Sequence, residues 1–447
     1  MKRTPHSPLA TACRSLERVS RPVGRFSPRK FDEVSHRPVI RRPAAAVSAV
    51  LLVVVALVAG CTSDKGGNSD SAKDNTPLAK VTLTPGADAK NVNPTAPISV
   101  TVTDGTIDQI ALTNANGKQV AGELAADKHS YQTTEPLGYD AKYTWSGTAA
   151  GADRKPVAID GTFTTLAPKN TFPATLNIAD NQEVGIAAPI ILQFKGSVQN
   201  KAAVEKALTI TTNPPTEGAW AWLPDDNGGS RVHWRPKDYW APGTTVHVAA
   251  KLYGLDLGGG NYGYSDLTSD FRIGRSQIVK ANAPSHRMQV VRDGQVVVDI
   301  PVSYGEGNEA RNVTRSGVHV VTEKYEDFMM SNPPFYTNVR ERWAVRISNN
   351  GEFIHANPES LSAQGSSNVT NGCINLSPSD AQAYFPTALY GDPVEVTGTS
   401  IALSAADGDL YDWTIDWNTW TGLSALQGEP KNPVSATPVP PLPAGGR

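Results

Sequence analysis

The chain has few cysteines and no histidine after His355. Cysteine occurs three times in 447 residues, at positions 13, 61 and 373. A disulfide framework needs paired cysteines, and a zinc site needs three or four converging Cys, His or carboxylate ligands. The sequence shows no such cluster, so we expect neither a metal site nor another cofactor.

Basic charge is scarce outside the first sixty residues. Residues 1–60 carry 11 Lys and Arg against 3 Asp and Glu, whereas residues 61–447 carry 30 against 40. A body with an excess of acidic groups and no basic stripe is a poor binder of phosphate backbones. The charge distribution therefore excludes nucleic acid as a partner.

The apolar run at residues 44–59 is short for a membrane span but suits the core of a signal peptide. A basic flank precedes it, and residues 58–61, Val-Ala-Gly-Cys, resemble the lipobox of bacterial lipoproteins. This resemblance implies that Cys61 carries lipid and becomes the first residue of the mature protein. We expect residues 1–60 to be a signal peptide and residues 61–78 a flexible tether.

The rest of the chain should then be exported, held at the cell membrane by the lipid and facing the cell wall or periplasm. An uncleaved membrane anchor is the alternative, and it also places the body outside the cytoplasm. Either way, Cys373 is the one cysteine left for the folded body, and it has no disulfide partner. It is either a small buried apolar residue or a reactive thiol.

Proline and glycine are abundant, with 34 and 38 residues, and this favours strands and turns over long helices. Short β-rich runs recur about every ten residues up to position 274, which is typical of β-sandwiches. We predict a mainly β chain with two tandem immunoglobulin-like β-sandwiches, at residues 79–167 and 168–274. A short helix is expected at residues 201–207.

The pattern changes after residue 275. An Asp293-Gly294 pair between two apolar runs predicts a hairpin with a type I′ turn. Ser377 followed by proline predicts the start of a short helix. We expect a β-rich domain at residues 275–398, with strands that include 317–325, 343–348, 353–355 and 393–397. His319 falls in one of these strand patterns and is interpreted as a packed histidine.

Three tryptophans, at positions 413, 417 and 420, have the spacing of one helix face. We expect residues 399–429 to dock through them onto the β-rich domain or the preceding sandwich, with sugar stacking as the alternative. Residues 430–447 are rich in proline and are predicted to be a disordered tail.

The most informative pattern joins His355 to Cys373. Fourteen residues separate His355 from Thr370-Asn371-Gly372-Cys373-Ile374-Asn375. This arrangement resembles the catalytic motif of the L,D-transpeptidase family: a His, then 14 to 17 residues, then Ser/Thr-His-Gly-Cys-x-Asn. The resemblance covers about 277–397. The sandwiches, lipobox and tail resemble the long actinobacterial form of these enzymes.

The resemblance implies a cysteine acyltransferase in which Cys373 is the nucleophile and His355 its base. A free thiol has a pKa of about 8.5, so a nearby imidazole is needed to raise the thiolate fraction. A glycine before the thiol allows the tight turn that lets the Gly372 and Cys373 amides face an oxyanion. The family also implies orienting roles for the Ala356 carbonyl and for Asn375.

Other site residues follow from the same resemblance. Asn371 replaces the usual histidine before the glycine, which leaves the base in place but changes the hydrogen bonding near the thiol. A flap over the site is expected at residues 325–339. The expected substrate contacts are Tyr336, Asn350, Gly351 and Thr370.

The implied substrate is the tetrapeptide stem of peptidoglycan. Cys373 would form a thioester with the third residue, release D-alanine and pass the acyl group to a second stem, giving a three-to-three cross-link. Carbapenem β-lactams are expected to acylate the same thiol. An L,D-carboxypeptidase, with water as the acceptor, remains open, as does an inactive cell-wall scaffold, which Asn371 would favour.

Two other classes of thiol enzyme are excluded by residue order. Papain-like peptidases place a histidine after the cysteine, and this chain has none beyond His355. Sortases need an arginine after the cysteine, and the next one here is Arg447 at the chain end.

Overall fold

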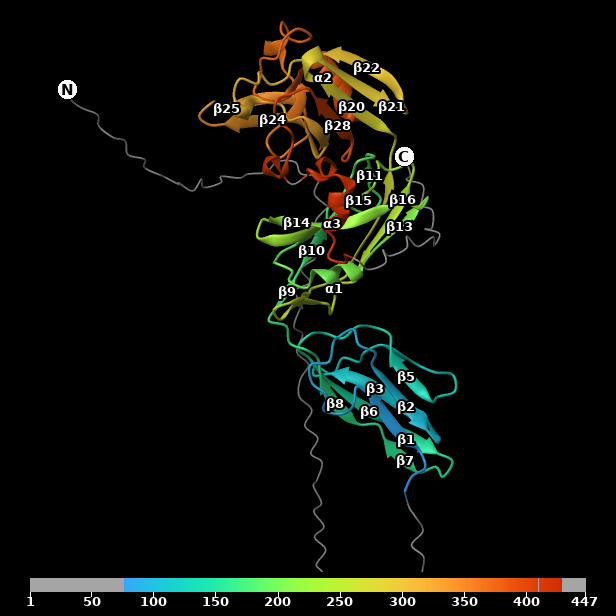
Figure 1. The fold of residues 1–447 in the computed structure, drawn as a ribbon. Helices are drawn as coiled ribbons and strands as arrows, with labels where there is room; N and C mark the ends of the chain where they lie inside the picture. The colour runs from blue at the N-terminus through green and yellow to red at the C-terminus, as the bar shows by residue number, and fades with distance from the viewer. Residues whose placement is uncertain (1–75, 409, 428–447) are drawn as a thin grey trace, which may run out of the picture. The chain divides into compact units, whose positions relative to one another are not determined.

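The computed structural model describes residues 76–408 and 410–427 of the chain (Figure 1). They are mostly β, as predicted. The predicted signal peptide, the lipidated Cys61, most of the tether and the proline-rich tail lie outside the described residues. Two compact units are present. The N-terminal unit comprises residues 76–172 and 252–265, and the C-terminal unit comprises residues 173–251 and the described residues from 266 on.

The N-terminal unit contains the first predicted sandwich. Its two antiparallel sheets share one core in which Trp145 and Phe163 are almost fully buried. Alternation is clear in β2, where Val100 and Val102 are buried and their neighbours are not. The sheets are β1 (Lys80–Thr84), β2 (Ser99–Thr103), β5 (Ser130–Thr133) and β4 (Gly122–Leu124), and β3 (Gly105–Asn114), β6 (Lys142–Gly151), β7 (Pro156–Ala158) and β8 (Gly161–Thr164).

Residues 252–265 belong to this unit, although the sequence placed them inside the second sandwich at 168–274. Two tyrosines explain the difference. The Tyr253 hydroxyl donates to the Leu137 carbonyl at 2.6 Å, and the Tyr139 hydroxyl donates to the Gly263 carbonyl at 2.7 Å. A small sheet of β17 (Asp256–Gly258), β18 (Asn261–Gly263) and β9 (Asn170–Phe172) completes the segment.

The second sandwich lies in the C-terminal unit. The faces of its two sheets bury Leu192, Phe194, Val246, Val248 and Phe271. Helix α1 (Lys201–Lys206) forms where a short helix was predicted. One sheet is β10 (Ala174–Leu176), β12 (Ile190–Phe194), β15 (Gly229–Pro236) and β14 (Gly218–Asp226), and the other is β11 (Glu183–Val184), β19 (Leu267–Ile273), β16 (Thr245–Ala250) and β13 (Leu208–Asn213).

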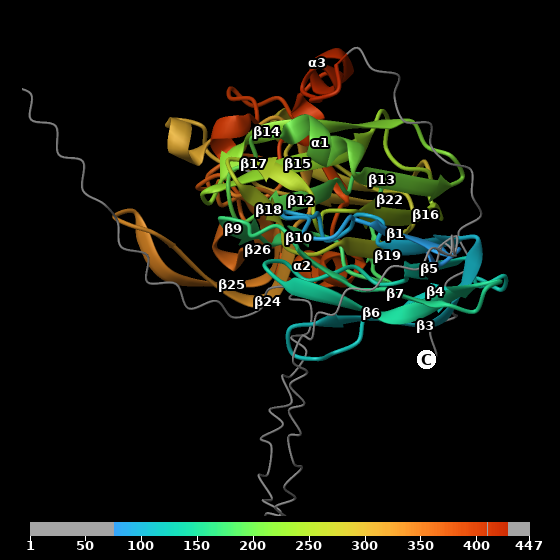
Figure 2. The ribbon, with the colours of Figure 1, turned by 90° about the horizontal axis from the view of Figure 1, so that it is seen from below.

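Two further sheets follow in the same unit. The five-stranded sheet runs in the order β22 (Gln295–Pro301), β21 (Arg287–Arg292), β20 (Gln277–Asn282), β28 (Pro393–Thr397) and β23 (Gly317–Val320). The four-stranded sheet runs β24 (Glu323–Asn332), β25 (Tyr336–Arg346), β26 (Phe353–Ala356) and β27 (Ile374–Leu376). Figure 2 shows the long β24–β25 hairpin reaching beyond the rest of its sheet.

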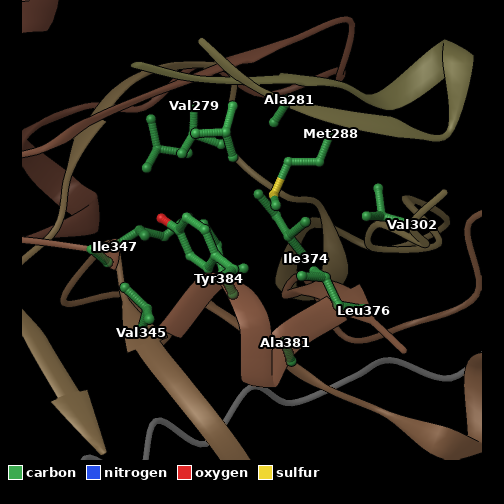
Figure 3. Packing of buried hydrophobic residues seen from close by; sticks show 14 of the residues in the cluster. Val279, Ala281, Met288, Val302, Val345, Ile347, Ile374, Leu376, Ala381 and Tyr384 are labelled. Carbon is green, nitrogen blue, oxygen red and sulfur yellow. The ribbon is translucent and has the colours of Figure 1, made fainter. Parts of the chain in front are cut away.

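An apolar core joins these two sheets to helix α2 (Pro378–Tyr384). Met288 from β21, Ile374 from β27 and Tyr384 from α2 converge in it (Figure 3). The predicted local signals are present at its borders: Asp293 and Gly294 have φ of 49° and 80°, and Ser377 caps α2 by accepting from the Asp380 N–H. One-turn 3-10 helices complete the unit at Ala283–Ser285, Ala310–Asn312, Pro358–Ser360, Phe385–Thr387, Ala405–Asp407 and Asp412–Thr414.

The segment after β28 packs on the second sandwich. The indole N–H of Trp413 donates to the Ala187 carbonyl and that of Trp420 to the Ala219 carbonyl, both at 2.9 Å. Arg235 lies 4.7, 5.3 and 4.6 Å from the ring centroids of Trp413, Trp417 and Trp420. The expected single helix is divided, because α3 (Trp417–Gly422) begins after Trp413. None of the helices formed by residues 76–408 and 410–427 is long and apolar enough to cross a membrane.

Candidate active site

Strand register brings His355 and Cys373 to the same face of the four-stranded sheet. In the parallel pair β26–β27, Ile354 lies opposite Ile374 and His355 opposite Asn375. Side chains two residues apart share a face, so Cys373, which directly precedes β27, lies on the side of His355. The opposite face, with Ile354 and Ile374, belongs to the apolar core. The motif therefore carries the polar residues on one side and the packing residues on the other.

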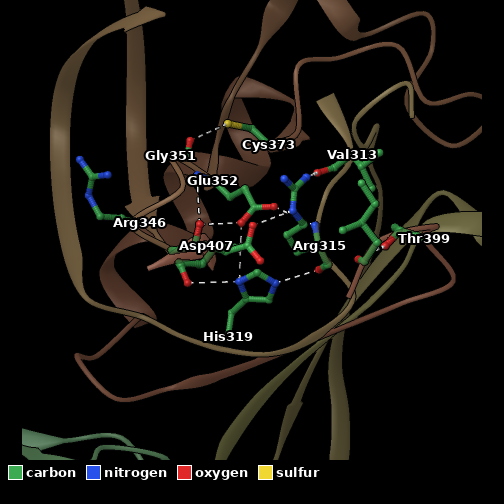
Figure 4. Close-up of polar contacts among 12 residues, drawn as sticks. Val313, Arg315, His319, Arg346, Gly351, Glu352, Cys373, Thr399 and Asp407 are labelled. Carbon is green, nitrogen blue, oxygen red and sulfur yellow. Dashed lines mark hydrogen bonds and ion pairs between the residues drawn. The ribbon is translucent and has the colours of Figure 1, made fainter. Parts of the chain in front are cut away.

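Cys373 is a buried thiol with an apolar lining. Its side chain clusters with Met330 of β24, Ala344 of β25 and Phe353 of β26. The thiol donates to the Gly351 carbonyl, with 3.7 Å between sulfur and oxygen (Figure 4). The thiol also interacts with His355, and this interaction is one of the causes that raise the pKa of the imidazole. The burial of the sulfur fits the first interpretation of this cysteine, and its reactivity stays a prediction.

His355 is held through its Nδ1 atom. The Ala356 carbonyl lies 2.9 Å from Nδ1 and the Glu341 carboxylate lies 3.0 Å from it. Burial lowers the pKa of the His355 imidazole, but the hydrogen bonds and negative charges of Cys373 and Glu341 outweigh burial and raise it. Cys373 and Glu341 therefore favour the protonated form of the His355 imidazole.

Asn375 connects the two ends of the loop at residues 370–373, called the catalytic loop below. Its amide donates to the Cys373 carbonyl and the Thr370 hydroxyl, each at 2.8 Å, and to the Ser303 carbonyl at 3.1 Å. Gly372 has φ of 115°, a conformation that a side chain would strain. Because the Thr370 hydroxyl is engaged inside the loop, its substrate-binding role stays a prediction.

Asn371 is exposed, and its side chain contacts Arg311 and not the Cys373 thiol. Its carbonyl oxygen accepts from Arg311 at 3.2 Å, and the Arg311 guanidinium lies 3.8 Å from the centroid of the Phe335 ring at the hairpin tip. An amide oxygen suits this place because it can accept from a cation. These contacts connect the catalytic loop to the tip of the β24–β25 hairpin.

Residues 325–339, the predicted flap, lie within the β24–β25 hairpin, and their role as a flap stays a prediction. Tyr336 packs against the cluster around Cys373. Burial and the negative charges of Cys373 and Glu341 raise the pKa of its phenol. Asn350 and Gly351 are exposed beside the thiol, and the Gly351 carbonyl is its acceptor. Their contact with a substrate stays a prediction.

A second polar cluster surrounds Glu352, the residue after Gly351 (Figure 4). The Glu352 carboxylate accepts from the Arg315 backbone N–H at 2.7 Å and from the Ser348 hydroxyl at 2.5 Å. Arg315 also binds Asp407, in the segment after β28, at 2.8 Å. His319 sits in this cluster as a packed strand histidine, as predicted.

Sequence reasoning missed Glu341, Arg311 and the Arg315–Asp407 pair. No spacing rule marks them, because each reaches its partner through tertiary contacts. Among residues 76–408 and 410–427, no three His, Cys, Asp or Glu side chains gather in a way that could hold a metal ion.

Comparison with known proteins identifies the family of the domain that contains this site. Residues 276–396 match the family model of the L,D-transpeptidase catalytic domain, and residues 89–256 match that of a bacterial Ig domain. "L,D-transpeptidase 5" of Mycobacterium tuberculosis (strain ATCC 25618 / H37Rv) is 59% identical over 360 residues, 80% of this chain and 80% of that protein. "L,D-transpeptidase 2" of Mycobacterium tuberculosis (strain CDC 1551 / Oshkosh) is 35% identical over 84% of this chain and 94% of its own length.

Among solved structures, the L,D-transpeptidase LdtMt1 in complex with imipenem is 30% identical, with a TM-score of 0.42 over 50% of this chain and 97% of that chain. The matches to the two sequence relatives cover 80% and 84% of this chain, and the residues that match the L,D-transpeptidase model include Cys373 and His355. The chain therefore belongs to the L,D-transpeptidase family of enzymes.

Proposed function

We propose that the protein cross-links peptidoglycan through a Cys373 thioester. The observation that carries this proposal is the register of β26 and β27, which puts the buried Cys373 on the same face as His355, whose Nδ1 is fixed by the Ala356 carbonyl at 2.9 Å. This arrangement leaves Nε2 to take the thiol proton. The names of the relatives support an L,D-transpeptidase reaction.

In the first half-reaction the Cys373 sulfur attacks the carbonyl of the third residue of a tetrapeptide stem, and its proton goes to His355. The backbone amides of Gly372 and Cys373 stabilise the resulting oxyanion. The bond to the terminal D-alanine then breaks, and His355 returns the proton to the leaving amine. The product is a thioester and free D-alanine.

In the second half-reaction the side-chain amine of another stem attacks the thioester. His355 accepts a proton from this amine, the carbon–sulfur bond breaks, and an amide joins the two third residues. Cys373 regains its starting state. Water in place of the amine gives the carboxypeptidase reaction, so the acceptor decides between the two outcomes.

The test is dimer formation from a disaccharide-tetrapeptide, followed by mass spectrometry, with wild type, Cys373→Ala and His355→Ala. We expect dimer and D-alanine from wild type and neither from the two variants. His247→Ala is the matched control, because His247 bonds Asp270 in the second sandwich, and it should retain full activity. Full activity in either site variant would refute the role of that residue, and tripeptide in place of dimer would identify a carboxypeptidase.

Carbapenem binding gives a second test of the nucleophile. Intact-mass analysis should show one adduct on wild type and none on Cys373→Ala. Wild type without an adduct and without dimer formation would instead support an inactive scaffold.

We also propose that the protein is exported and anchored in the cell membrane by lipid on Cys61. The lipobox-like residues 58–61 behind an apolar run support this location. Cys61→Ser should move the protein from the membrane fraction to the soluble fraction and abolish labelling by a radioactive fatty acid. Unchanged labelling in the variant would contradict lipidation at this cysteine.

A further inference from the structure

Glu341 is an inward-facing carboxylate on an otherwise exposed stretch of strand. It lies on β25, and its side chain is 14% exposed against 4% for His355. Its neighbours Arg340 and Arg342 are 64% and 51% exposed and both pair with Asp327 on the adjacent strand. Glu341 instead places a carboxylate oxygen 3.0 Å from Nδ1 of His355.

A β-bulge explains why Glu341 faces His355. In the antiparallel pair β25–β26, Arg342 lies opposite Ala356 and Val345 lies opposite Ile354. Two residues, Trp343 and Ala344, therefore share the place opposite His355. The extra residue reverses the alternation of β25, so that Glu341 lies on the side of His355. Without it, Glu341 would point to the other face.

The bulge has a conformational cost at one residue. Trp343 has φ of 54°, which is rare for a bulky side chain. Such strained positions and bulges occur beside active sites, where they re-aim a side chain. The residue re-aimed here is a carboxylate, and its target is the imidazole beside the thiol.

The carboxylate adds something that the Ala356 carbonyl lacks. Nδ1 has one proton to donate, and the carbonyl at 2.9 Å is enough to fix the tautomer. Of these two neighbours of Nδ1, only Glu341 carries a negative charge, which stabilises the imidazolium over the neutral ring. The titratable groups that face the imidazole are Cys373 on one side and Glu341 on the other, with Tyr336 next to both.

We propose that Glu341 is a positioning residue of the acyl transfer. It holds the ring with Nδ1 turned away from the thiol, and it stabilises the charged ring that forms when Nε2 takes the proton of Cys373. The proposal rests on the proposed function in that Cys373 is taken to be the nucleophile.

The first test compares Glu341→Gln with wild type over a range of pH. Gln keeps the shape and a hydrogen-bond acceptor but removes the charge, so the pKa of His355 should fall. The imidazolium then persists over a narrower range, and the alkaline limb of the kcat/KM profile should move to lower pH. We expect kcat to fall about 10- to 100-fold with little change in KM. Glu341→Asp, which keeps the charge, should restore part of the activity.

The matched control is Glu326→Gln, which removes the same charge from an exposed position on the same hairpin. It should leave the pH profile unchanged. If Glu341→Gln keeps the wild-type profile, or if its activity falls only in proportion to the folded fraction measured by circular dichroism, the proposal is overturned.

A second readout separates this proposal from the proposed function. The rate at which iodoacetamide alkylates Cys373, followed by peptide mapping, reports the thiol–imidazole pair without any peptidoglycan substrate. Its pH profile should shift in Glu341→Gln and not in Glu326→Gln. If wild type forms no dimer while this shift is present, the proposed reaction fails and the effect of Glu341 on the thiol–imidazole pair stands. An unshifted alkylation profile would overturn the role of Glu341 alone.

Discussion

His319 and His355 are both buried in the C-terminal unit, and each has a glutamate nearby. His319 lies 3.9 Å from Glu352, and His355 lies 3.0 Å from Glu341. Their second nitrogens differ. Nδ1 and Nε2 of His319 face the carbonyls of Ile347 and Arg315, at 3.3 and 2.8 Å, whereas His355 has a carbonyl at Nδ1 and interacts with the Cys373 thiol.

This difference suits His319 to a structural role and His355 to the reactive role proposed above. A ring with a backbone carbonyl at each nitrogen is enclosed by the backbone and has no nitrogen that faces a substrate. A ring with one nitrogen fixed can exchange a proton with a neighbouring thiol through the other nitrogen and keep its orientation. His319 and His355 are of the same residue type and are both buried, so the groups that contact their ring nitrogens account for the difference in role.

The strongest way to break this comparison is to replace each histidine with asparagine. His355→Asn should reduce dimer formation by about 10³-fold, since the general base is lost, while the thermal midpoint changes little. His319→Asn should do the reverse, with a lower midpoint and near-normal activity per folded molecule. Activity and circular dichroism melting on the same samples check both. Equal loss of activity in the two variants would contradict the distinction.

The structural cluster can be probed through Asp407→Ala. The change leaves the buried Arg315 guanidinium without its carboxylate, so we expect the free energy of unfolding to fall by about 3 kcal/mol. Urea unfolding followed by tryptophan fluorescence measures this loss. The exposed pair Lys251–Asp266 is the control, and Asp266→Ala should cost less than about 1 kcal/mol. Similar losses in both variants would show that the burial of an ion pair does not determine how much the pair contributes to the free energy of unfolding.

The reactive cluster can be probed through Asn375→Ala. This change removes the amide that holds the Cys373 and Thr370 ends of the loop, and the thiol should lose its position. We expect carbapenem acylation to slow by up to about 100-fold. Stopped-flow fluorescence with a carbapenem gives the rate. An unchanged rate in a folded variant would remove Asn375 from the orienting residues.

The smallest expected effect is at the hairpin tip. Arg311→Ala removes the stacking on Phe335 and the bond to Asn371, and an exposed cation–π contact contributes about 0.5 to 1 kcal/mol. We expect KM for the donor stem to rise about two- to fivefold with kcat nearly constant. Arg311→Lys keeps the charge but loses the planar stack, so its KM should lie between the values of wild type and Arg311→Ala. A large fall in kcat would place Arg311 in the chemistry itself.

Local signals in the sequence predicted much of the fold. The Asp293-Gly294 turn and the Ser377 cap depend on neighbours in the chain, and the structure confirms them. The pairing of His355 with Cys373 was accessible for another reason: the motif fixes its own spacing, and the strands β26 and β27 are adjacent.

Long-range contacts account for what the sequence did not predict. Glu341 reaches His355 only because Trp343 adds a residue to β25, and no local pattern announces a bulge at a tryptophan. Asp407 meets Arg315 from 92 positions away. The three tryptophans were recognised as a packing group, but their common partner Arg235 lies in the preceding sandwich.

The most direct test of the central claim is to trap the acyl-enzyme. Wild type is mixed with a disaccharide-tetrapeptide donor, quenched in acid within one turnover and digested for peptide mapping. We expect a disaccharide-tripeptide thioester on the peptide that contains Cys373 and no adduct in Cys373→Ser. Dimer formation by an enzyme whose acyl group is never found on Cys373 would contradict the account.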